Sequence, residues 1–305
     1  MILIGKHDAQ HRAIAIRNVK RFIILLVFNC DWEFSVHKYS AVGRKRKFHH
    51  LPALIFCYIC IKHLSIMNKK TLVVLSGSGI SAESGIPTFR GGDGMWDNVP
   101  LEDVCTPEGW HRNPAFVSAF YNKMRRRLKE VEPNEAHRII ASLEDAFEVY
   151  VITQNVDNLH ERAGSSRVLH LHGELTKVRP DDCYTHQDGF SMKHVIDIGY
   201  RDVRDEERGG PRNRLLRPHI VFFGEAVPNI EPAMEIVSQA DILVVIGTSM
   251  QVYPAASLHS YAPYGCRKFM IDPAEAPAHA IRGVTHICKT ATLGMKELEP
   301  LLRGL

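Results

Sequence analysis

The chain has 305 residues, of which 45% are apolar and 24% are charged, and its formal net charge is +4. A chain of this size and composition can bury one large core and a small module, which predicts a soluble globular protein. The charge is uneven: residues 1–66 hold 11 of the 38 Lys and Arg residues but only 3 of the 34 Asp and Glu residues. Residues 67–305 therefore carry 27 basic and 31 acidic side chains, and this mildly acidic body argues against nucleic acid as a partner.

Residues 1–66 differ from everything that follows. Their apolar runs, Phe22–Phe28 and Leu51–Ile61, are shorter than the ~20 residues that a membrane span needs. A basic pair precedes the first run, but no small-residue cleavage site follows it, so no signal peptide is predicted. Met67 stands directly before the first expected strand. We expect residues 1–66 to be a poorly ordered extension or a start-site artefact, and residues 67–305 to form the folded domain that carries the function, without membrane attachment.

Expected strands and helices alternate through the rest of the chain. Short apolar and β-branched segments are typical of buried strands at Thr71–Ser76, Glu148–Thr153, Arg167–Leu171, His219–Phe223, Asp241–Gly247, Lys268–Ile271 and Thr285–Ile287. Helical patterns cover Pro114–Lys129, Asn134–Phe147 with Asn134 as the N-cap, Glu231–Gln239 and Leu293–Leu302. The alternation predicts an α/β fold with a doubly wound parallel Rossmann-like sheet, whose ligand crevice lies at the carboxyl ends of the strands. A small, partly irregular module is expected at about residues 174–216, which are rich in charge, Gly and Pro.

A glycine-rich turn follows the first expected strand. Gly77 and Gly79 would allow the backbone to approach a pyrophosphate closely, and a helix beginning there would direct its N–H groups at the anion. The spacing differs from the usual dinucleotide fingerprint, so the turn alone is weak evidence. Without further support, a purely structural turn is an equally good interpretation.

Three further segments have unusual side-chain sets: Thr153–Gly164 (TQNVDNLHERAG), Leu169–Leu175 (LHLHGEL) and Gly247–Ala256 (GTSMQVYPAA). Together with residues 77–97 they resemble the sirtuin family of NAD-dependent protein-lysine deacylases, and within it the bacterial branch related to the desuccinylase type. The resemblance extends from Met67 to the C-terminus. It implies NAD as cofactor, acylated-lysine proteins as substrates, and nicotinamide and O-acyl-ADP-ribose as products.

The resemblance assigns cofactor-binding positions to the strand ends. They are Gly77, Ser78, Gly79, Ser81, Glu83, Phe89, Arg90, Trp96, Gln154, Asn155, Val156, Asp157, Gly247, Thr248, Ser249 and Asp272. Amide and carboxylate groups at 154–157 would supply the fixed dipoles that a carboxamide and ribose hydroxyls need. Asp272 stands where many relatives have asparagine, and its carboxylate could accept from the adenosine ribose. Taken without the resemblance, Asp157 is an ordinary helix cap, and Phe89 and Arg90 are a core aromatic and a surface charge.

The catalytic residues implied by the resemblance are His172, Asn155 and Asp157. His172 matches the general base, a role that suits an imidazole with a pKa near ~6.5. A histidine at a strand end is more often only packed or solvated, and His170 alternates onto the same face of the same strand. Gly173 and the family match are what distinguish His172 from His170.

Substrate binding is expected at Val221, Phe223, Gly224 and Glu225, an extended segment that pairs with the substrate backbone in relatives. Tyr121 matches a desuccinylase-type tyrosine, but the arginine expected three residues later is Met124, and Arg125 follows it. One residue on a helix turns a side chain by about 100°. Two alternatives follow: Arg125 compensates and binds an acyl carboxylate, or the enzyme is chiefly a deacetylase.

Cysteine usage predicts the absence of zinc. Most sirtuins have two Cys-x-x-Cys pairs after the catalytic histidine, whereas the interval Gly173–Phe222 contains only Cys183. Cys57 and Cys60 form one such pair in the extension, with no second pair to complete a tetrahedral site. We therefore expect no metal. Seven cysteines without a secretion signal indicate a reducing cytoplasm.

Two other functions fit part of these motifs. A sirtuin-like ADP-ribosyltransferase or NAD hydrolase would share the NAD residues without needing an acyl-lysine channel, and the intact segment 223–225 argues against it. A non-catalytic NAD-sensing protein would be expected to lack His172 or Asn155. The sequence therefore favours a deacylase, which we expect to be monomeric.

Overall fold

The structure is a computed structural model that describes residues 69–88, 99–181, 184–185, 189–190 and 194–305. The chain divides into two units, Met1–Ile59 and Cys60–Leu305, and every described residue belongs to the second. The expectation for residues 1–66 lies outside the described residues. The same holds for Phe89, Arg90, Trp96 and Cys183.

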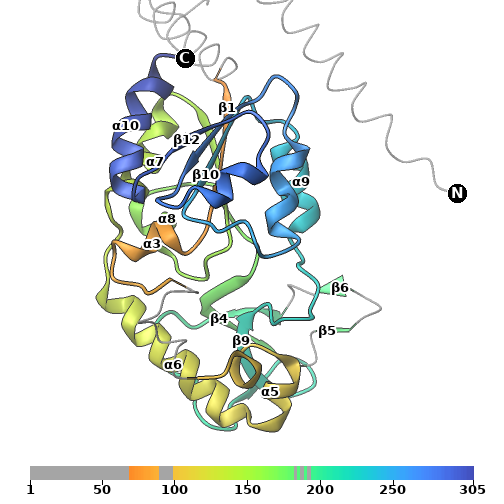
Figure 1. Ribbon diagram of the computed structural model, residues 1–305. Helices are drawn as coiled ribbons and strands as arrows, with labels where there is room; N and C mark the ends of the chain where they lie inside the picture. Colours follow the sequence, from red (N-terminus) through yellow and green to blue (C-terminus); the bar gives the residue numbers. More distant parts are fainter. Residues whose placement is uncertain (1–68, 89–98, 182–183, 186–188, 191–193) are drawn as a thin grey trace, which may run out of the picture. The chain divides into compact units, whose positions relative to one another are not determined.

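A six-stranded parallel sheet lies at the centre of the larger part of the described body (Figure 1). Its order is β12-β11-β10-β1-β2-β3, and every neighbouring pair is parallel. The strands are β1 (Thr71–Ser76), β2 (Glu148–Thr153), β3 (Val168–His170), β10 (Ile242–Ile246), β11 (Arg267–Ile271) and β12 (Val284–Ile287). The first strand, β1, lies in the middle of the sheet, so the strand order reverses between β1 and β10. A ligand crevice is expected at the carboxyl ends of the strands at such a reversal. The predicted α/β Rossmann-like fold is confirmed.

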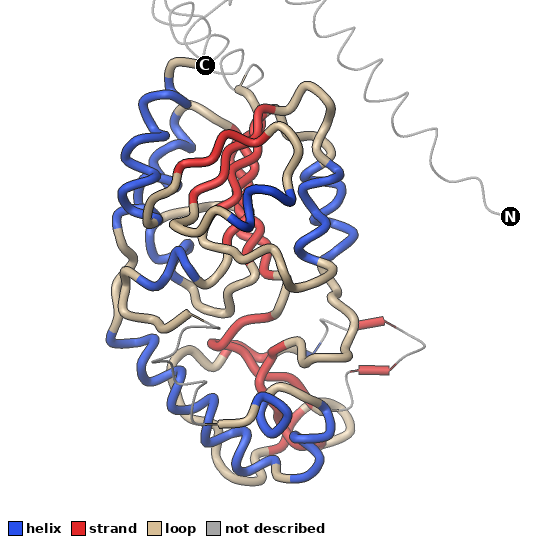
Figure 2. Tube along the Cα trace, viewed as in Figure 1, coloured by secondary structure: helices blue, strands red, loops and turns tan. Residues whose placement is uncertain are grey.

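Helices cover both faces of this sheet, as Figure 2 also shows. Alternate residues of β1 enter two separate cores: Leu72 and Val74 pack in one, Val73 and Leu75 in the other. The first core is closed by α7 (Glu135–Ser142) and α10 (Ala291–Arg303). The second is closed by α9 (Ile230–Val237) and η3 (Ala255–Tyr261). Burial on both faces explains why the strands are continuous apolar runs.

The remaining helices complete the helical part of the described body. They are α3 (Gly79–Ala82), α4 (Leu101–Val104), α5 (Pro107–Arg112), α6 (Pro114–Glu130), η1 (Leu143–Asp145), α8 (Leu159–Ala163) and η4 (Ala276–Ala280). Asn134 caps α7 as predicted, because its side chain accepts from the Ala136 N–H. The expected helix to Phe147 is shorter, since α7 ends at Ser142 and continues only as the 3₁₀ turn η1. No helix in the described ranges is long and apolar enough to cross a membrane.

A small antiparallel sheet with the order β7-β4-β9-β8 lies beside the carboxyl ends of the parallel strands (Figure 1). It consists of β4 (Gly173–Pro180), β7 (Ile196–Asp197), β8 (Arg208–Gly209) and β9 (Arg214–Ile220), while β5 (Tyr184–Thr185) and β6 (Gly189–Phe190) form a separate pair. Helices α5 and α6 share an apolar cluster with β4 and β9 through Trp110, Tyr121, Leu175 and Ile220.

The expected strand His219–Phe223 is wrong in both bounds and partners. The observed strand is β9, which pairs antiparallel with β4 in the small sheet rather than parallel in the large one. Residues 221–223 continue it without strand structure. A short apolar run fits a buried strand of either kind, so its periodicity does not reveal the direction of pairing. The antiparallel sheet spans Gly173–Ile220, slightly more than the expected 174–216.

Candidate functional site

Two glycine turns meet at the carboxyl ends of β1 and β10. The Gly77 N–H donates to the Ile246 carbonyl at 3.0 Å, and the Gly79 N–H donates to the Gly247 carbonyl at 2.8 Å. A Cβ atom added to Gly79 would lie 2.7 Å from the Gly247 Cα, and one added to Gly247, where φ is +61°, would lie 2.3 Å from the Ile80 nitrogen. Side chains are therefore sterically excluded from this glycine contact, and main-chain atoms form the surface there.

A cavity of about 720 Å³ opens above the glycine contact. Most positions predicted from sequence line it: Gly77, Ser78, Gly79, Ser81, Glu83, Tyr121, Gln154, Asn155, Val156, Asp157, His172, Val221, Phe223, Gly224, Glu225, Gly247, Thr248, Ser249 and Asp272. Arg125 is not among its lining residues. Sequence reasoning missed Ile86, Cys105, Phe222 and Val252 as lining residues. Ile86 and Val252 lie within marked segments and Phe222 within the expected strand 219–223, whereas Cys105 lies in none of them.

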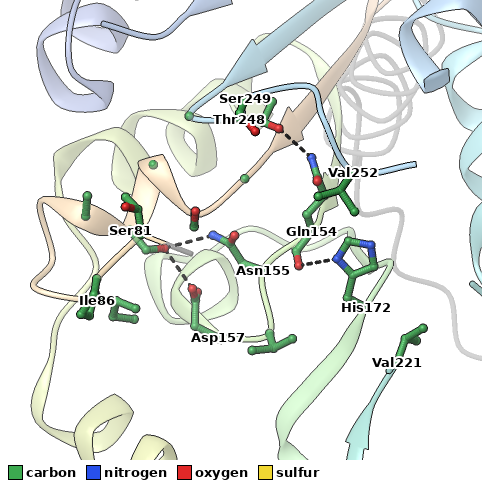
Figure 3. A pocket seen from close by; sticks show the side chains of 18 of the residues that line it. Ser81, Ile86, Gln154, Asn155, Asp157, His172, Val221, Thr248, Ser249 and Val252 are labelled. Carbon is green, nitrogen blue, oxygen red and sulfur yellow. Dashed lines mark hydrogen bonds between the residues drawn. The ribbon is translucent and has the colours of Figure 1, made fainter. Parts of the chain in front are cut away.

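Ser81 connects the two polar residues at the centre of the cavity (Figure 3). Its hydroxyl donates to Asp157 Oδ2 at 2.9 Å and accepts from the Asn155 side-chain amide at 3.1 Å. Asp157 also accepts from the Leu159 N–H at 3.1 Å. Burial raises the pKa of the Asp157 carboxyl, while the hydrogen bonds from Leu159 and Ser81 oppose that shift. Asn155 and Asp157 are thus held in fixed orientations before any ligand binds.

His172 lies between β3 and β4, where its ring faces the cavity (Figure 3). Its Nδ1–H donates to the Gln154 carbonyl at 3.0 Å, and Gln154 in turn donates its side-chain amide to Thr248 Oγ1 at 3.0 Å. The bond from His172 to the Gln154 carbonyl places the proton of the neutral ring on Nδ1 and leaves Nε2 as an acceptor. Burial lowers the pKa of His172, so the neutral form dominates at pH 7. The geometry suits a general base.

Gly173 explains why a glycine must follow this histidine. Its φ is +88°, and an added Cβ would lie 1.9 Å from the His219 carbonyl oxygen. Any side chain would therefore push β4 away from β9 and displace the histidine ring.

Cys105, Tyr121 and Met124 form an apolar pocket within the cavity. The ring of Tyr121 stacks on Phe222 with centroids 6.3 Å apart, and its hydroxyl lies 3.5 Å from the Cys105 sulfur. Burial raises the pKa of the Cys105 thiol to about 11, so the thiol stays protonated. Within the described chain, no Lys or Arg lines the cavity.

Arg125 lies outside this pocket, contrary to its expected role in substrate binding. Its side chain is fully buried, with the guanidinium donating to the Leu175 carbonyl at 3.2 Å and to the Asn122 side chain. The one-residue offset on α6 has turned it into the small module, where it joins the helix to β4. Met124 occupies the pocket instead.

Two predicted ligand-binding carboxylates are engaged by the protein itself. Glu225 accepts from Arg217 at 2.7 Å, from Arg179 at 3.1 Å and from the Phe222 N–H at 2.8 Å, so its charge is directed into the module. Glu83 accepts from the Thr292 N–H at 2.8 Å and holds the start of α10.

Asp272, at the end of β11, keeps one carboxylate oxygen close to its own turn. Oδ1 accepts from the Ala274 N–H at 2.9 Å. Burial raises the pKa of this carboxyl, and the Ala274 N–H partly offsets the rise. Asp272 lines the cavity. It follows Ile271, whose carbonyl accepts from the Gly247 N–H at 3.0 Å, so Asp272 lies close to the glycine contact.

Buried histidines behind the cavity make the fold sensitive to acid. His137 donates Nδ1–H to Asn134 at 3.1 Å, and its ring meets that of His160 with centroids 4.9 Å apart. His160 Nε2 lies 3.0 Å from Ser76 Oγ, which donates to Thr153. Burial lowers the pKa of His137 to about 4 and that of His160 well below its ordinary value.

Folding stability should therefore fall as the pH drops below about 6.5, where the unfolded chain takes up protons that the folded state refuses. Each such histidine contributes up to about 1.4 kcal/mol per pH unit between about 6.5 and its folded pKa. Urea unfolding at pH 7.5, 6.5 and 5.5 measures this loss. His137→Gln should show a smaller loss per pH unit than the wild type, and an equal slope in both proteins would contradict the assignment.

No group of three or more His, Cys, Asp or Glu side chains in the described ranges could hold a metal ion. Cys183 lies outside these ranges. The expectation of a zinc-free module stays a prediction.

The lining residues fit a dinucleotide. The turn at Gly77 and Gly79, with no Cβ atom at either glycine, allows a pyrophosphate to approach the main chain closely. The amides and carboxylate of Gln154, Asn155 and Asp157 suit a carboxamide and hydroxyl groups. The cavity volume of about 720 Å³ lies within the range of cofactor sites.

Comparison with known proteins supports the same conclusion. The NAD-dependent protein deacylase of Bacteroides thetaiotaomicron is 50% identical over 235 residues, covering 76% of this chain and 98% of the relative. A crystal structure of a Sir2 homolog–NAD complex superposes with a TM-score of 0.67 at 36% identity, covering 80% of this chain and 94% of the other. A structure of Sir2 with a p53 peptide and NAD⁺ superposes with a TM-score of 0.61 at 28% identity, covering 79% and 97%. The Sir2 family model matches residues 77–254, and the chain belongs to this family.

Proposed function

We propose that this protein is an NAD-dependent protein-lysine deacylase that removes neutral acyl groups and releases nicotinamide and O-acyl-ADP-ribose. The observation that carries the proposal is the position of His172. Its unprotonated Nε2 belongs to the same cavity as the glycine contact and the Ser81, Asn155 and Asp157 network. When bound, NAD supplies an electrophilic ribose carbon whose leaving group is nicotinamide.

The residues of the chain have distinct tasks in this reaction. His172 accepts a proton at Nε2, and the Gln154 carbonyl holds its ring in the required tautomer. Asn155 and Asp157, fixed by Ser81, orient the cofactor at the centre of the cavity. The extended segment 221–224 borders the cavity, and its half-exposed Phe223 and exposed Gly224 leave room for a substrate strand alongside.

The apolar pocket of Cys105, Tyr121 and Met124, which we call the acyl pocket, determines which acyl groups are accepted. Cys105, Tyr121 and Met124 present a thiol, a phenol and a thioether, and the nearest arginine on α6 is fully buried elsewhere. A succinyl or malonyl carboxylate would enter this pocket without a cation among its described lining residues. Burying an unpaired carboxylate costs several kcal/mol, so acetyl and other neutral groups are favoured.

The test is NAD-dependent deacylation of matched acetyl-lysine and succinyl-lysine peptides by the full chain. We expect kcat/KM to be at least about tenfold higher for the acetyl peptide, because an unpaired carboxylate is destabilised in the pocket. Met124→Arg should raise succinyl-peptide turnover and lower acetyl-peptide turnover, since the new guanidinium can bind the carboxylate. Met124→Leu keeps the pocket apolar and should retain the acetyl preference. A succinyl preference in the wild type would contradict the proposed acyl class.

The same assay separates the two other functions. Nicotinamide release without any acyl peptide would favour an NAD hydrolase or ADP-ribosyltransferase. Tight NAD binding without turnover of either peptide would favour an NAD-sensing protein.

A further inference from the structure

Two histidines, His170 at the end of β3 and His172 in the turn that follows it, donate to two consecutive carbonyl groups. His172 donates to the carbonyl of Gln154 at 3.0 Å, and His170 donates Nδ1–H to the carbonyl of Asn155 at 2.9 Å. Their second nitrogens differ. That of His172 belongs to the cavity, whereas Nε2 of His170 lies 2.8 Å from a carboxylate oxygen of Glu161. The proposed function uses His172 alone and leaves the role of His170 unexplained.

The hydrogen bonds of His170 define its protonation state. The Asn155 carbonyl can only accept, and so can an ionised Glu161. A neutral imidazole has one N–H, so both bonds require the doubly protonated cation. The ring is buried, with 7% of the side chain exposed, while Glu161 at 40% remains in contact with water. His170 is thus a buried cation paired with a half-exposed carboxylate.

The charged and titratable groups around His170 come from several elements. Asp157 precedes α8, and His160 and Glu161 lie on it. Glu174 and Lys177 on β4 pair with each other at 2.6 Å, and His219 lies on β9. Burial lowers the pKa of His170, but the hydrogen bond and charge of Glu161, together with Glu174, raise it above its ordinary value.

The bond from His170 fixes the carbonyl of Asn155, and two other bonds fix its N–H and its side-chain amide. The Asn155 N–H donates to Thr153 Oγ1 at 3.0 Å, and its side-chain amide donates to Ser81. His170 itself is held by Asn229, whose side chain donates to the His170 carbonyl at 2.7 Å. Loss of the His170 bond would free the peptide between Asn155 and Val156, which leads directly to Asp157.

We propose that His170, together with Glu161, is a positioning pair: its two donated hydrogen bonds hold the Asn155 carbonyl and thereby keep Asn155 and Asp157 in place at the cofactor end of the cavity. The inference rests on the proposed function. His170 transfers no proton in the reaction. Because a neutral ring can keep only one of its two bonds, activity should fall as the pH rises through the His170 pKa, while His172 sets the fall at acidic pH.

Glu161→Gln tests the pair, because glutamine can still accept from Nε2 but lacks the charge that favours the cation. We expect its alkaline limb in the pH profile of kcat/KM to move down by about one pH unit, since loss of a hydrogen-bonded carboxylate typically shifts a pKa by one unit or more. The acidic limb should stay fixed. KM for NAD should rise at pH 8, whereas KM for the acyl peptide should not.

Glu174→Gln is the matched control. Its carboxylate is also near His170 but bonds to Lys177 rather than to the imidazole. It should therefore move the alkaline limb by less than Glu161→Gln. His170→Gln should lose the alkaline limb altogether, because an amide donor does not titrate.

A measurement on the protein without cofactor or substrate separates this inference from the proposed function. Side-chain ¹H–¹⁵N NMR should show His170 doubly protonated and His172 neutral at pH 7.5, and Glu161→Gln should lower the His170 midpoint. The inference would be overturned by a neutral His170 at pH 7.5. It would also be overturned if Glu161→Gln lowered activity without moving the alkaline limb of the kcat/KM pH profile. Absence of NAD-dependent deacylation by the wild type, with His170 still cationic, would overturn the proposed function instead.

Discussion

Replacing Glu225 by alanine is expected to destabilise the protein by about 3–5 kcal/mol, the cost of removing one partner from a buried ion pair. Glu225 lies between Arg179 and Arg217, and the three side chains are 1–4% exposed. Its removal leaves two buried guanidinium groups without their shared counter-charge. Arg217 also lies over the ring of Phe222, with 3.9 Å from the guanidinium carbon to the centroid, so disorder at this ionic cluster reaches the cavity wall.

Chemical denaturation at pH 7.5 measures the free energy of unfolding of this variant. Glu225→Gln is the graded control, because it keeps an oxygen that can accept from the Phe222 N–H but removes the charge. Its loss of stability should be intermediate. A change below about 1 kcal/mol for alanine would mean that the arginines find solvent or other acceptors, as exposed pairs do.

Replacing His172 by alanine is expected to lower kcat/KM for deacylation by about 10²–10⁴-fold, the usual contribution of a positioned general base. NAD binding should persist, because the glycine contact and the Ser81 network do not depend on the imidazole. The wild-type enzyme should keep its activity below pH 6.5, since burial lowers the pKa of His172 and only the neutral ring can accept a proton.

Steady-state kinetics with an acetyl-lysine peptide, paired with NAD titration by calorimetry, checks both parts of this expectation. His259→Ala is a suitable control because that half-buried histidine on η3 does not line the cavity. Activity of His172→Ala within about tenfold of the wild type would assign the general base elsewhere, given what such groups normally contribute.

Local pattern was sufficient for the elements of the parallel sheet. The bounds of β1 and β2 agree with the predicted Thr71–Ser76 and Glu148–Thr153, because strands buried on both faces are unbroken apolar runs that end abruptly at polar turns. The strand around His219 could not be assigned in the same way. Its partner is β4, and the choice of an antiparallel neighbour depends on contacts that the run itself does not encode.

For the site, too, some features were predictable from the sequence and others were not. Motifs placed His172, Asn155 and Asp157 correctly in one cavity, because residues at the ends of neighbouring parallel strands meet at one edge. Side-chain direction was less accessible: the position of Arg125 on α6 turns it into the small module, and it does not line the cavity. The partner of a charged side chain was also not predictable: the carboxylate of Glu225 forms ion pairs with two buried arginines, Arg179 and Arg217. Nothing in the sequence around Cys105 pointed to the acyl pocket.

The contact between Gly79 and Gly247 limits how this enzyme's cofactor preference can change. Both turns present peptide groups, and neither accepts a Cβ atom, so no single substitution there can add a charge or a hydrogen-bonding side chain. Selection between related dinucleotides would have to use other lining residues, among which Asp272 provides a half-buried carboxylate. The sequence predicts that Asp272 accepts from the adenosine ribose, and a phosphate added to that ribose would then face its negative charge, so we expect a change in dinucleotide specificity to require substitution of Asp272.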